Sequence, residues 1–281
     1  MSEMSTTRSI LIVVRNYTLY ICVSLLALQL YFFLRVASFA YINPESTSFE
    51  RSEAFRIAGL KSQLTPSAIQ LKLPWLQEWR PSALISVNLK RAVIVSEDDI
   101  FTSHFGVQWE AIERAWTRNA KAEELALQAQ MRANNGSGNG NGNGNGNSNG
   151  KVNKALKNVK LVGGSTITQQ LAKNLFLSKE RNLLRKGQEL LITLELETLL
   201  PKSRILELYL NHVEWGAGVF GAEAASRHYF SNTALQLTPN QCARLAVMLP
   251  RPKFFERNLG SAYLADRAEV IESRMYGAKL P

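Results

Sequence analysis

Residues 163–174 read Gly-Gly-Ser-Thr-Ile-Thr-Gln-Gln-Leu-Ala-Lys-Asn, a stretch that predicts the start of a helix able to hold an anion. The two glycines let the backbone turn and approach a ligand closely. Thr166 and Gln169 stand in capping-box spacing, which predicts that the helix begins at Thr166. A helix N-terminus offers free N–H groups with partial positive charge, and Lys173 adds a full charge one turn into the helix.

The two faces of this predicted helix differ in chemistry. One face is polar and carries Thr166, Gln169, Gln170 and Lys173, whereas the other carries Ile167, Leu171 and Leu175. The polar face either lines an anion-binding groove or is the solvated side of an ordinary capped helix. The rest of the chain has to decide between these two interpretations.

The composition indicates one sizeable domain with an anionic partner. The chain has 281 residues, of which 46% are hydrophobic, and this is enough for a real core. Its formal net charge of +10 suits a polyanion, an anionic membrane surface or a phosphate-bearing substrate. The sequence contains no recognisable nucleic-acid module, so we expect no nucleic-acid partner.

An uncharged apolar run begins after Arg15 and ends before Arg35. Its length is close to the roughly 20 residues that cross a bilayer as a helix, so we expect a transmembrane helix at 16–36 after a tail at 1–15. Tyrosines toward both ends are typical of membrane interfaces, and the flanking charges slightly favour an N-terminus on the inside. Residues Ala37–Ala40 weakly resemble a cleavage site, which leaves removal of the run as an alternative.

Several classes of site are excluded. Cys22 lies inside the apolar run and Cys242 lies far downstream, so we expect the two cysteines not to pair and expect no disulfide framework. The His and Cys spacing of metal sites is missing from the sequence. The sequence also lacks a Walker-type loop, a Rossmann-type loop and a nucleophile elbow.

Apolar periodicity predicts a mainly α fold with few strands. The expected helices are 87–95, 109 to about 131, one starting at 166, 187–200, 204–212 with Ser203 as its cap, 222–229, 239–249 and 262–276. Glycines at 216, 218 and 221 predict a turn.

The expected soluble domain is 41–281. Prolines interrupt a juxtamembrane segment at 41–83, where Trp75 and Trp79 suit either the headgroup level or the core. Residues 134–150 are almost pure Gly and Asn, so they predict a disordered insertion that cannot bury apolar surface.

Three consecutive carboxylates, Glu97, Asp98 and Asp99, follow the apolar helix predicted at 87–95. Crowding and partial burial raise carboxyl pKa values, which is what a general base near neutral pH needs. The competing interpretation is an exposed acidic helix end. His104 nearby is expected to be a hydrogen-bonded structural histidine.

A basic segment with one carboxylate is the third unusual feature. It carries Arg181, Arg185, Lys186 and Glu189. Arg185 and Glu189 are one helical turn apart, so a simple ion pair within the helix is one interpretation. The other is a basic cluster that clamps phosphate beside a positioned carboxylate.

These segments resemble the signature of the peptidoglycan glycosyltransferases. Four blocks carry the resemblance in the family's order: Glu97–Gly106, Gly163–Gln170, Arg185–Glu189 and Ile205–Asn211. They span about 84–250, and Trp215–Gly221 resembles the monofunctional biosynthetic branch in particular. Two features depart from the pattern. The Gly/Asn tract falls between the first two blocks, and Arg251 stands where relatives often have Asn.

The resemblance implies a lysozyme-like α domain with a small membrane-facing jaw, and a reaction that polymerises lipid II into glycan strands with inversion. It implies Glu97 as general base and Glu189 as a second catalytic residue. The implied substrate-binding residues are Asp98, Ser165, Thr166, Gln169, Gln170, Lys173, Arg181, Arg185 and Lys186. Whether a divalent cation such as Mg²⁺ or Mn²⁺ also binds at the site is left open by the sequence.

The implied partners are lipid II, the growing lipid-linked strand and the bilayer, with cell-division or wall-synthesis proteins as further candidates. The implied location is the bacterial inner membrane, as a single-pass protein whose catalytic domain is periplasmic. Two alternatives stay open. A pair of carboxylates also suits a glycan-cleaving hydrolase, and a non-catalytic scaffold of the wall-synthesis machinery would share the membrane anchor.

Overall fold

The computed structural model describes residues 2–63, 75–110, 164–177 and 182–281, together with positions 113, 117, 120, 121, 124, 125 and 128; at 2–11 and 60–63 it describes the backbone alone. The chain forms two compact units. The first combines 1–106 with 167–281, and the second is 107–166. The predicted Gly/Asn insertion at 134–150 lies outside the described residues.

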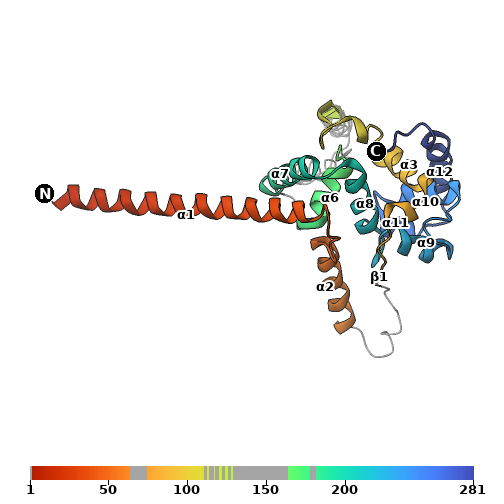
Figure 1. Cartoon of the computed structure of the whole chain (residues 1–281), viewed down its shortest axis with the longest axis horizontal. Coiled ribbons are helices and arrows are strands. Elements are labelled where there is room, and N and C mark those ends of the chain that lie inside the picture. The colour runs from red at the N-terminus through yellow and green to blue at the C-terminus, as the bar shows by residue number, and fades with distance from the viewer. Residues whose placement is uncertain are drawn as a thin grey trace, which may run out of the picture. The chain divides into compact units, whose positions relative to one another are not determined.

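The first unit is built almost entirely from helices, as predicted. Its helices are α1 (Ser2–Ser38), α2 (Ser48–Gln63), α3 (Val87–Glu97), α6 (Ile167–Phe176), α7 (Leu183–Leu199), α8 (Lys202–His212), α9 (Ala222–Phe230), α10 (Pro239–Met248), α11 (Pro252–Glu256) and α12 (Ala262–Met275), with 3-10 turns at Ser82–Leu84 and Phe101–Ser103. Helix α10 packs against α3 and α12, and α6 packs against α7 and α8 (Figure 1). In the second unit, the described positions from Trp109 to Gln128 are helical, in line with the helix predicted there.

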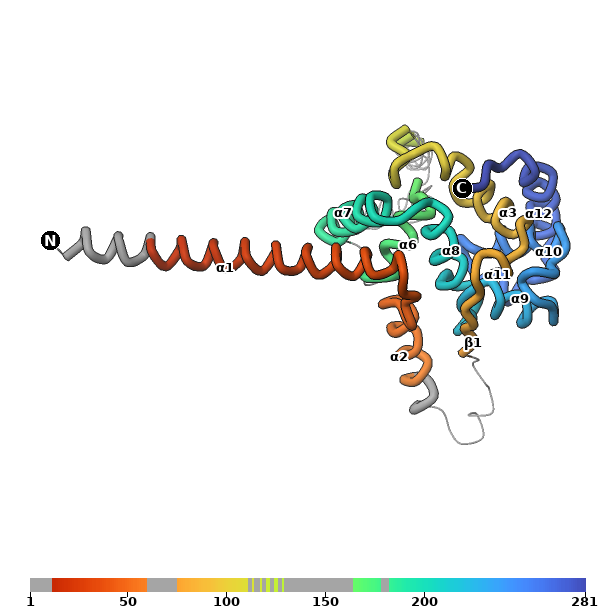
Figure 2. Tube along the Cα trace, viewed as in Figure 1, coloured from red at the N-terminus to blue at the C-terminus, as the bar shows by residue number. Residues whose placement is uncertain are grey.

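The stretch Ile12–Ser38 of α1 is long and apolar enough to cross a membrane, and it is the one such segment among the described residues. The predicted span, 16–36, lies inside it. Figure 2 follows α1 to the point where the chain turns into α2. The last turns of α1 enter the hydrophobic core, where Val36 and Phe39 are 0% and 2% exposed. Cleavage at Ala37–Ala40 would therefore split the core, which argues against the signal-peptide alternative.

Helix α2 was not predicted, because prolines at 66, 74 and 81 made the segment 41–83 look like an irregular linker. Thr47 and Glu50 form a reciprocal capping box at its start. Glu50 is buried and accepts a hydrogen bond from His212 Nδ1 at 2.8 Å. Lys253 Nζ donates to the buried Glu53 at 2.7 Å. These partners tie α2 to α8 and α11.

A small sheet accompanies the helices. It consists of β1 (Leu76–Gln77), β3 (Val219–Phe220) and β2 (Glu214–Gly216), in that spatial order. Strand β1 runs parallel to β3, with Leu76 opposite Val219, whereas β2 and β3 form an antiparallel hairpin. The turn predicted from the glycines is this hairpin. Trp75 packs on Phe220 beside the sheet, whereas Trp79 packs against the core and His212.

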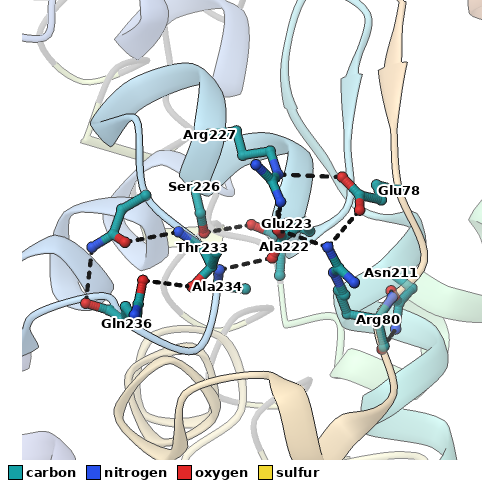
Figure 3. A network of polar contacts seen from close by, with 11 residues as sticks. Glu78, Arg80, Asn211, Ala222, Glu223, Ser226, Arg227, Thr233, Ala234 and Gln236 are labelled. Carbon is teal, nitrogen blue, oxygen red and sulfur yellow. Dashed lines mark hydrogen bonds and ion pairs between the residues drawn. The ribbon is translucent and has the colours of Figure 1, made fainter.

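A polar network around the buried Glu223 joins α8, α9 and the segment before α3 (Figure 3). Glu223 is buried and accepts hydrogen bonds from Arg227 Nε at 2.8 Å and from the Ala234 N–H at 2.8 Å. Arg80 also reaches Glu223, at 3.3 Å, and its backbone N–H donates to Asn211 at 2.8 Å. The contacts of Arg80 with Asn211 and Glu223 hold the end of α8, the helix that carries Tyr209.

Three helix boundaries differ from the predictions by two residues or more. Helix α3 continues to Glu97 instead of ending at residue 95. Helix α7 begins at Leu183 instead of 187, because the Asn182 side chain accepts a hydrogen bond from the Arg185 N–H and caps it. Ser203 is not a cap: α8 already begins at Lys202, after Pro201, whose restricted backbone starts the helix abruptly.

Gly221, which precedes α9, gives a stability prediction. Its φ is +84°, and a Cβ placed there would lie 2.7 Å from the Asn211 carbonyl oxygen. We expect Gly221→Ala to destabilise the protein by about 1–3 kcal/mol or more, because strain and a backbone clash combine. Gly59→Ala is the matched control: a Cβ there meets nothing within 4 Å, so it should stabilise α2 by roughly 0.5–1 kcal/mol. Denaturant unfolding of the detergent-solubilised chain measures both, and equal effects would contradict the argument.

Candidate functional site

Glu97 is the last residue of α3, and its side chain is partly exposed in surroundings that are mostly protein. Its Oε2 accepts a hydrogen bond from Gln170 Nε2 at 2.8 Å. Burial raises the pKa of Glu97 above its ordinary value, against hydrogen bonds from Gln170 and Ser96 that lower it. The Asp98 charge also raises this pKa, and the Lys173 charge lowers it. A reachable carboxylate with a raised pKa has the properties of a general base.

Tyr209 of α8 fixes the orientation of the Gln170 amide. The buried Tyr209 hydroxyl donates to Gln170 Oε1 at 3.0 Å, so the amide NH₂ group faces Glu97. Burial raises the pKa of Tyr209 well above its usual value, which keeps the hydroxyl protonated and able to donate. No role was predicted for Tyr209, although it lies in the block Ile205–Asn211 that carries the family resemblance.

Asp98 is buried and serves as an internal support. It accepts hydrogen bonds from His104 Nε2 at 2.8 and 3.1 Å and from the Ile167 N–H at 3.0 Å. The hydrogen bond from the Ile167 N–H caps the first turn of α6 with a carboxylate from the end of α3. His104 is thus the structural histidine that was predicted. Asp98 was predicted among the substrate-binding residues, and this role stays a prediction; its side chain has no exposed surface and holds the neighbouring elements together.

The polar residues of α6 are not the solvated face of an ordinary helix. Gln169 and Asn174 are buried, and Gln170 and Lys173 are only partly exposed. The reason is that α2, α7 and α8 all pack against α6. One polar contact shows this directly: Thr168 Oγ1 donates to Glu197 of α7 at 2.6 Å.

The other predicted residues are Ser165, Thr166 and Arg181, with Gly163 of the opening block. Ser165 and Thr166 belong to the second unit, Ser165 exposed and Thr166 buried, and both come just before α6 in the chain. Gly163 and Arg181 lie outside the described residues. Their predicted roles stay predictions.

Glu189 lies buried on α7 between two cations. Arg185 Nη1 donates to its Oε2 at 3.1 Å, and Lys186 forms an ion pair with its Oε1. The predicted ion pair within the helix is therefore present. Arg185 also keeps a buried Nε–H that has no hydrogen-bond partner among the described residues. Two cations against one carboxylate leave a positive charge and a free donor, which together suit an anion.

The structure thus brings the predicted residues together in two groups. Glu97, Asp98 and Gln170 meet where α3 ends and α6 begins, and Lys173 is close enough to lower the pKa of Glu97. Arg185, Lys186 and Glu189 meet on α7, which packs against α6. A carboxylate with a raised pKa thus lies beside two helices that carry cations, an arrangement suited to transferring a group away from an anionic leaving group.

A family model described as Transglycosylase matches residues 71–129 and 147–276. The chain belongs to the transglycosylase family. This confirms the resemblance drawn from the four blocks, and with it the predicted class of enzyme. The match spans α3 through α12, so it covers every helix that carries a described candidate residue.

Curated relatives of this transglycosylase are similar over nearly their whole length. A protein from Paraburkholderia xenovorans (strain LB400) is 44% identical over 261 residues, which cover 93% of this chain and 90% of that protein. One from Janthinobacterium sp. (strain Marseille) is 46% identical over 256 residues, covering 91% and 92%. One from Herminiimonas arsenicoxydans is 44% identical over 259 residues, covering 91% and 92%. All three are named "Biosynthetic peptidoglycan transglycosylase".

The carboxylates in the described part of this transglycosylase do not form a metal centre by themselves. Among the described residues, no group of three or more His, Cys, Asp or Glu side chains could hold a metal ion. The Asp98 carboxylate already accepts hydrogen bonds from His104 and from the Ile167 N–H of α6. A Mg²⁺ or Mn²⁺ ion would have to take most of its ligands from a substrate diphosphate.

Proposed function

We propose that this protein polymerises lipid II into the linear glycan strands of peptidoglycan by inverting glycosyl transfer. The observation that carries the proposal is the carboxyl of Glu97, whose pKa burial raises, held against Gln170 in a chain of the transglycosylase family. The names of the relatives give the substrate class, since all three are called peptidoglycan transglycosylases.

In the proposed reaction, Glu97 takes the proton from the 4-hydroxyl of the GlcNAc in an incoming lipid II. The hydroxyl oxygen attacks the anomeric carbon of the lipid-linked strand from the face opposite the leaving group. The bond from that carbon to the diphosphate oxygen breaks, and undecaprenyl diphosphate leaves with the electron pair. Attack from the opposite face inverts the linkage from α to β.

Cations must stabilise the charge that develops on the departing diphosphate. Lys173 near Glu97 and the Arg185–Lys186 pair on α7 are the described candidates, and Arg181 remains a predicted one. The unpartnered Nε–H of Arg185 supports this role, because a phosphate oxygen would satisfy it. Glu189 then holds Arg185 and Lys186 in position for the diphosphate, rather than acting as a second base.

Two features support a site at the bilayer surface. Leu183 and Leu184, in the first turn of α7, are 90% and 88% exposed. The same helix contacts the membrane-spanning segment, where Gln29 Nε2 donates to Gln188 at 2.9 Å. An apolar pair beside the span suits insertion among lipid tails, and thus the membrane-facing jaw. The periplasmic placement of the domain belongs to the proposal, since wall polymer is made there.

Incubation of the full-length protein in detergent with lipid II, followed by separation of products by size, tests the proposal. Long strands support it. Cleavage of preformed glycan without strand growth would favour the hydrolase alternative, and lipid II binding without any product would favour the scaffold. Either of the last two outcomes would overturn the proposed polymerase.

The Gln170 contact gives a pH prediction. Its hydrogen bond lowers the pKa of Glu97, so Gln170→Leu should raise that pKa further. The acidic limb of kcat/KM should then move to higher pH, because more alkaline solution is needed to ionise the base. Tyr209→Phe should cause a smaller shift in the same direction, since the amide is only freed to rotate.

Thr168→Val is the matched control for this experiment. It removes a hydrogen bond from the same helix, to Glu197, but none to Glu97. The pH profile of this variant should keep its wild-type midpoint even where the rate falls. A shift equal to that of Gln170→Leu would show that loosening α6 alone moves the profile.

A further inference from the structure

A cavity lies at the end of α6 opposite the one that meets Glu97. Its volume is about 470 Å³, within the usual range for ligand pockets. Its walls come from the last turns of α1, the start of α2 and the C-terminal turn of α6. None of the predicted catalytic or substrate-binding residues lines it.

One wall of this cavity is aromatic. Phe176 at the end of α6 contacts Phe32 with ring centroids 5.3 Å apart and stacks on Phe39 at 5.9 Å. Phe32 lies in the last turns of α1 and Phe39 directly follows that helix, so both are near the residue where the apolar span finishes. A surface of this kind accepts an acyl chain.

The other side of the cavity is cationic. The Arg35 guanidinium lies 5.2 Å from the Phe39 ring centroid. Arg51 is held by Ser46 and Ser48, to whose hydroxyl oxygens it donates at 3.1 Å. Within the described residues, no carboxylate forms an ion pair with either arginine. Two uncompensated positive charges therefore face one cavity, and they call for an anion.

The position of Arg35 near the end of the span points to a phosphate group as the anion. Arg35 lies three residues before Ser38, where the span ends, so it sits about 4–5 Å along the helix from that end. Arginines at this level meet the phosphate groups of the bilayer. A ligand with a phosphate at the arginines and a hydrocarbon chain along the phenylalanines matches both walls.

We infer that this cavity binds the phosphate headgroup of an anionic bilayer phospholipid, with one acyl chain along Phe32, Phe39 and Phe176. The lipid joins α1, α2 and α6 at a place separate from Glu97. The inference does not rest on the proposed reaction, because it needs only a membrane-anchored chain.

Native mass spectrometry of the full-length protein in a neutral detergent tests this inference. Titration with phosphatidylglycerol should show one tightly retained lipid, and diacylglycerol, which lacks the phosphate, should not be retained. The double variant R35Q/R51Q should retain phosphatidylglycerol about 30-fold more weakly, because two arginines near the phosphate are lost. Both side chains are exposed, so the fold should be unchanged.

The double variant R257Q/R267Q is the control, since it makes the same charge change at exposed arginines outside the cavity. It should retain the lipid as the wild type does. Equal retention by R35Q/R51Q and the wild type would overturn the inference, as would an equal loss in the control. Displacement by millimolar inorganic phosphate would show a site for free anions instead. Displacement by equimolar undecaprenyl diphosphate would reassign the cavity to the substrate.

Discussion

Replacing Glu97 with Gln should reduce glycan-strand formation by about 10²–10⁴-fold, the usual contribution of a general base, and leave the folded protein at least as stable as the wild type. The amide cannot take the proton of the acceptor hydroxyl, although its oxygen can still accept the hydrogen bond from Gln170. Strand formation from lipid II at several pH values, with thermal unfolding of the same samples, measures both expectations.

The stability expectation follows from the sign of the pKa shift. Burial raises the pKa of Glu97, so the folded protein binds a proton there more tightly than the unfolded chain does. The stability contributed by this group falls as pH rises from the ordinary Glu pKa through the raised one. Glu97→Gln removes this pH-dependent loss of stability, because the amide does not ionise. The variant should therefore be more stable than the wild type at pH values above the raised pKa of Glu97, and the difference should vanish below the ordinary Glu pKa.

Glu195→Gln is the matched control for Glu97→Gln. Burial also raises the pKa of Glu195, which lies on α7 outside both groups of candidate residues. This variant should show a pH-linked gain in stability of the same sign and keep wild-type strand formation. A comparable loss of activity in Glu195→Gln would remove the case for Glu97 as the base.

The second large effect is expected for Asp98→Ala, which should destabilise the protein by about 2–5 kcal/mol. The substitution leaves the His104 Nε2–H and the Ile167 N–H without their buried acceptor, and each costs roughly 1–3 kcal/mol. Thermal unfolding should show a Tm lower by roughly 4–20 °C. Activity should fall as well, because the bond to Ile167 holds α6 and Gln170 against the end of α3.

Asp99→Ala provides the comparison for Asp98→Ala. Asp99 is the exposed neighbour, and its carboxylate approaches Arg274 only at 3.9 Å. Its loss should change stability by no more than about 0.5 kcal/mol. Similar losses in the two variants would mean that charge near the end of α3 matters, and not the buried hydrogen bonds of Asp98.

Local sequence patterns predicted the elements that carry the site. Helical periodicity placed the helix that ends at Glu97, and the charge pattern placed Glu189 one turn from Arg185. These are relations between residues a few positions apart. The predicted burial of a carboxylate was also right for Glu97, whereas the same reasoning could not tell that Asp98 would be the fully buried one.

The features that sequence reasoning missed depend on distant partners. Helix α2 carries the buried acids Glu50 and Glu53, and such residues look solvated until His212 and Lys253 are known to face them. The role of Tyr209 depends on Gln170, which lies 39 positions earlier on another helix. No local periodicity encodes such pairs, because burial of a polar group is decided by what packs against it.

The end of α1 has a consequence for how the protein folds. Val36 belongs both to the helix that crosses the membrane and to the core of the soluble domain, and Phe39, which directly follows that helix, lies in the same core. Membrane insertion and domain folding are therefore one coupled equilibrium: a bilayer that moves the end of the span changes the free energy of unfolding of the enzyme. A soluble fragment that begins after the span starts with an incomplete core, and the thickness of the host membrane becomes a determinant of its stability.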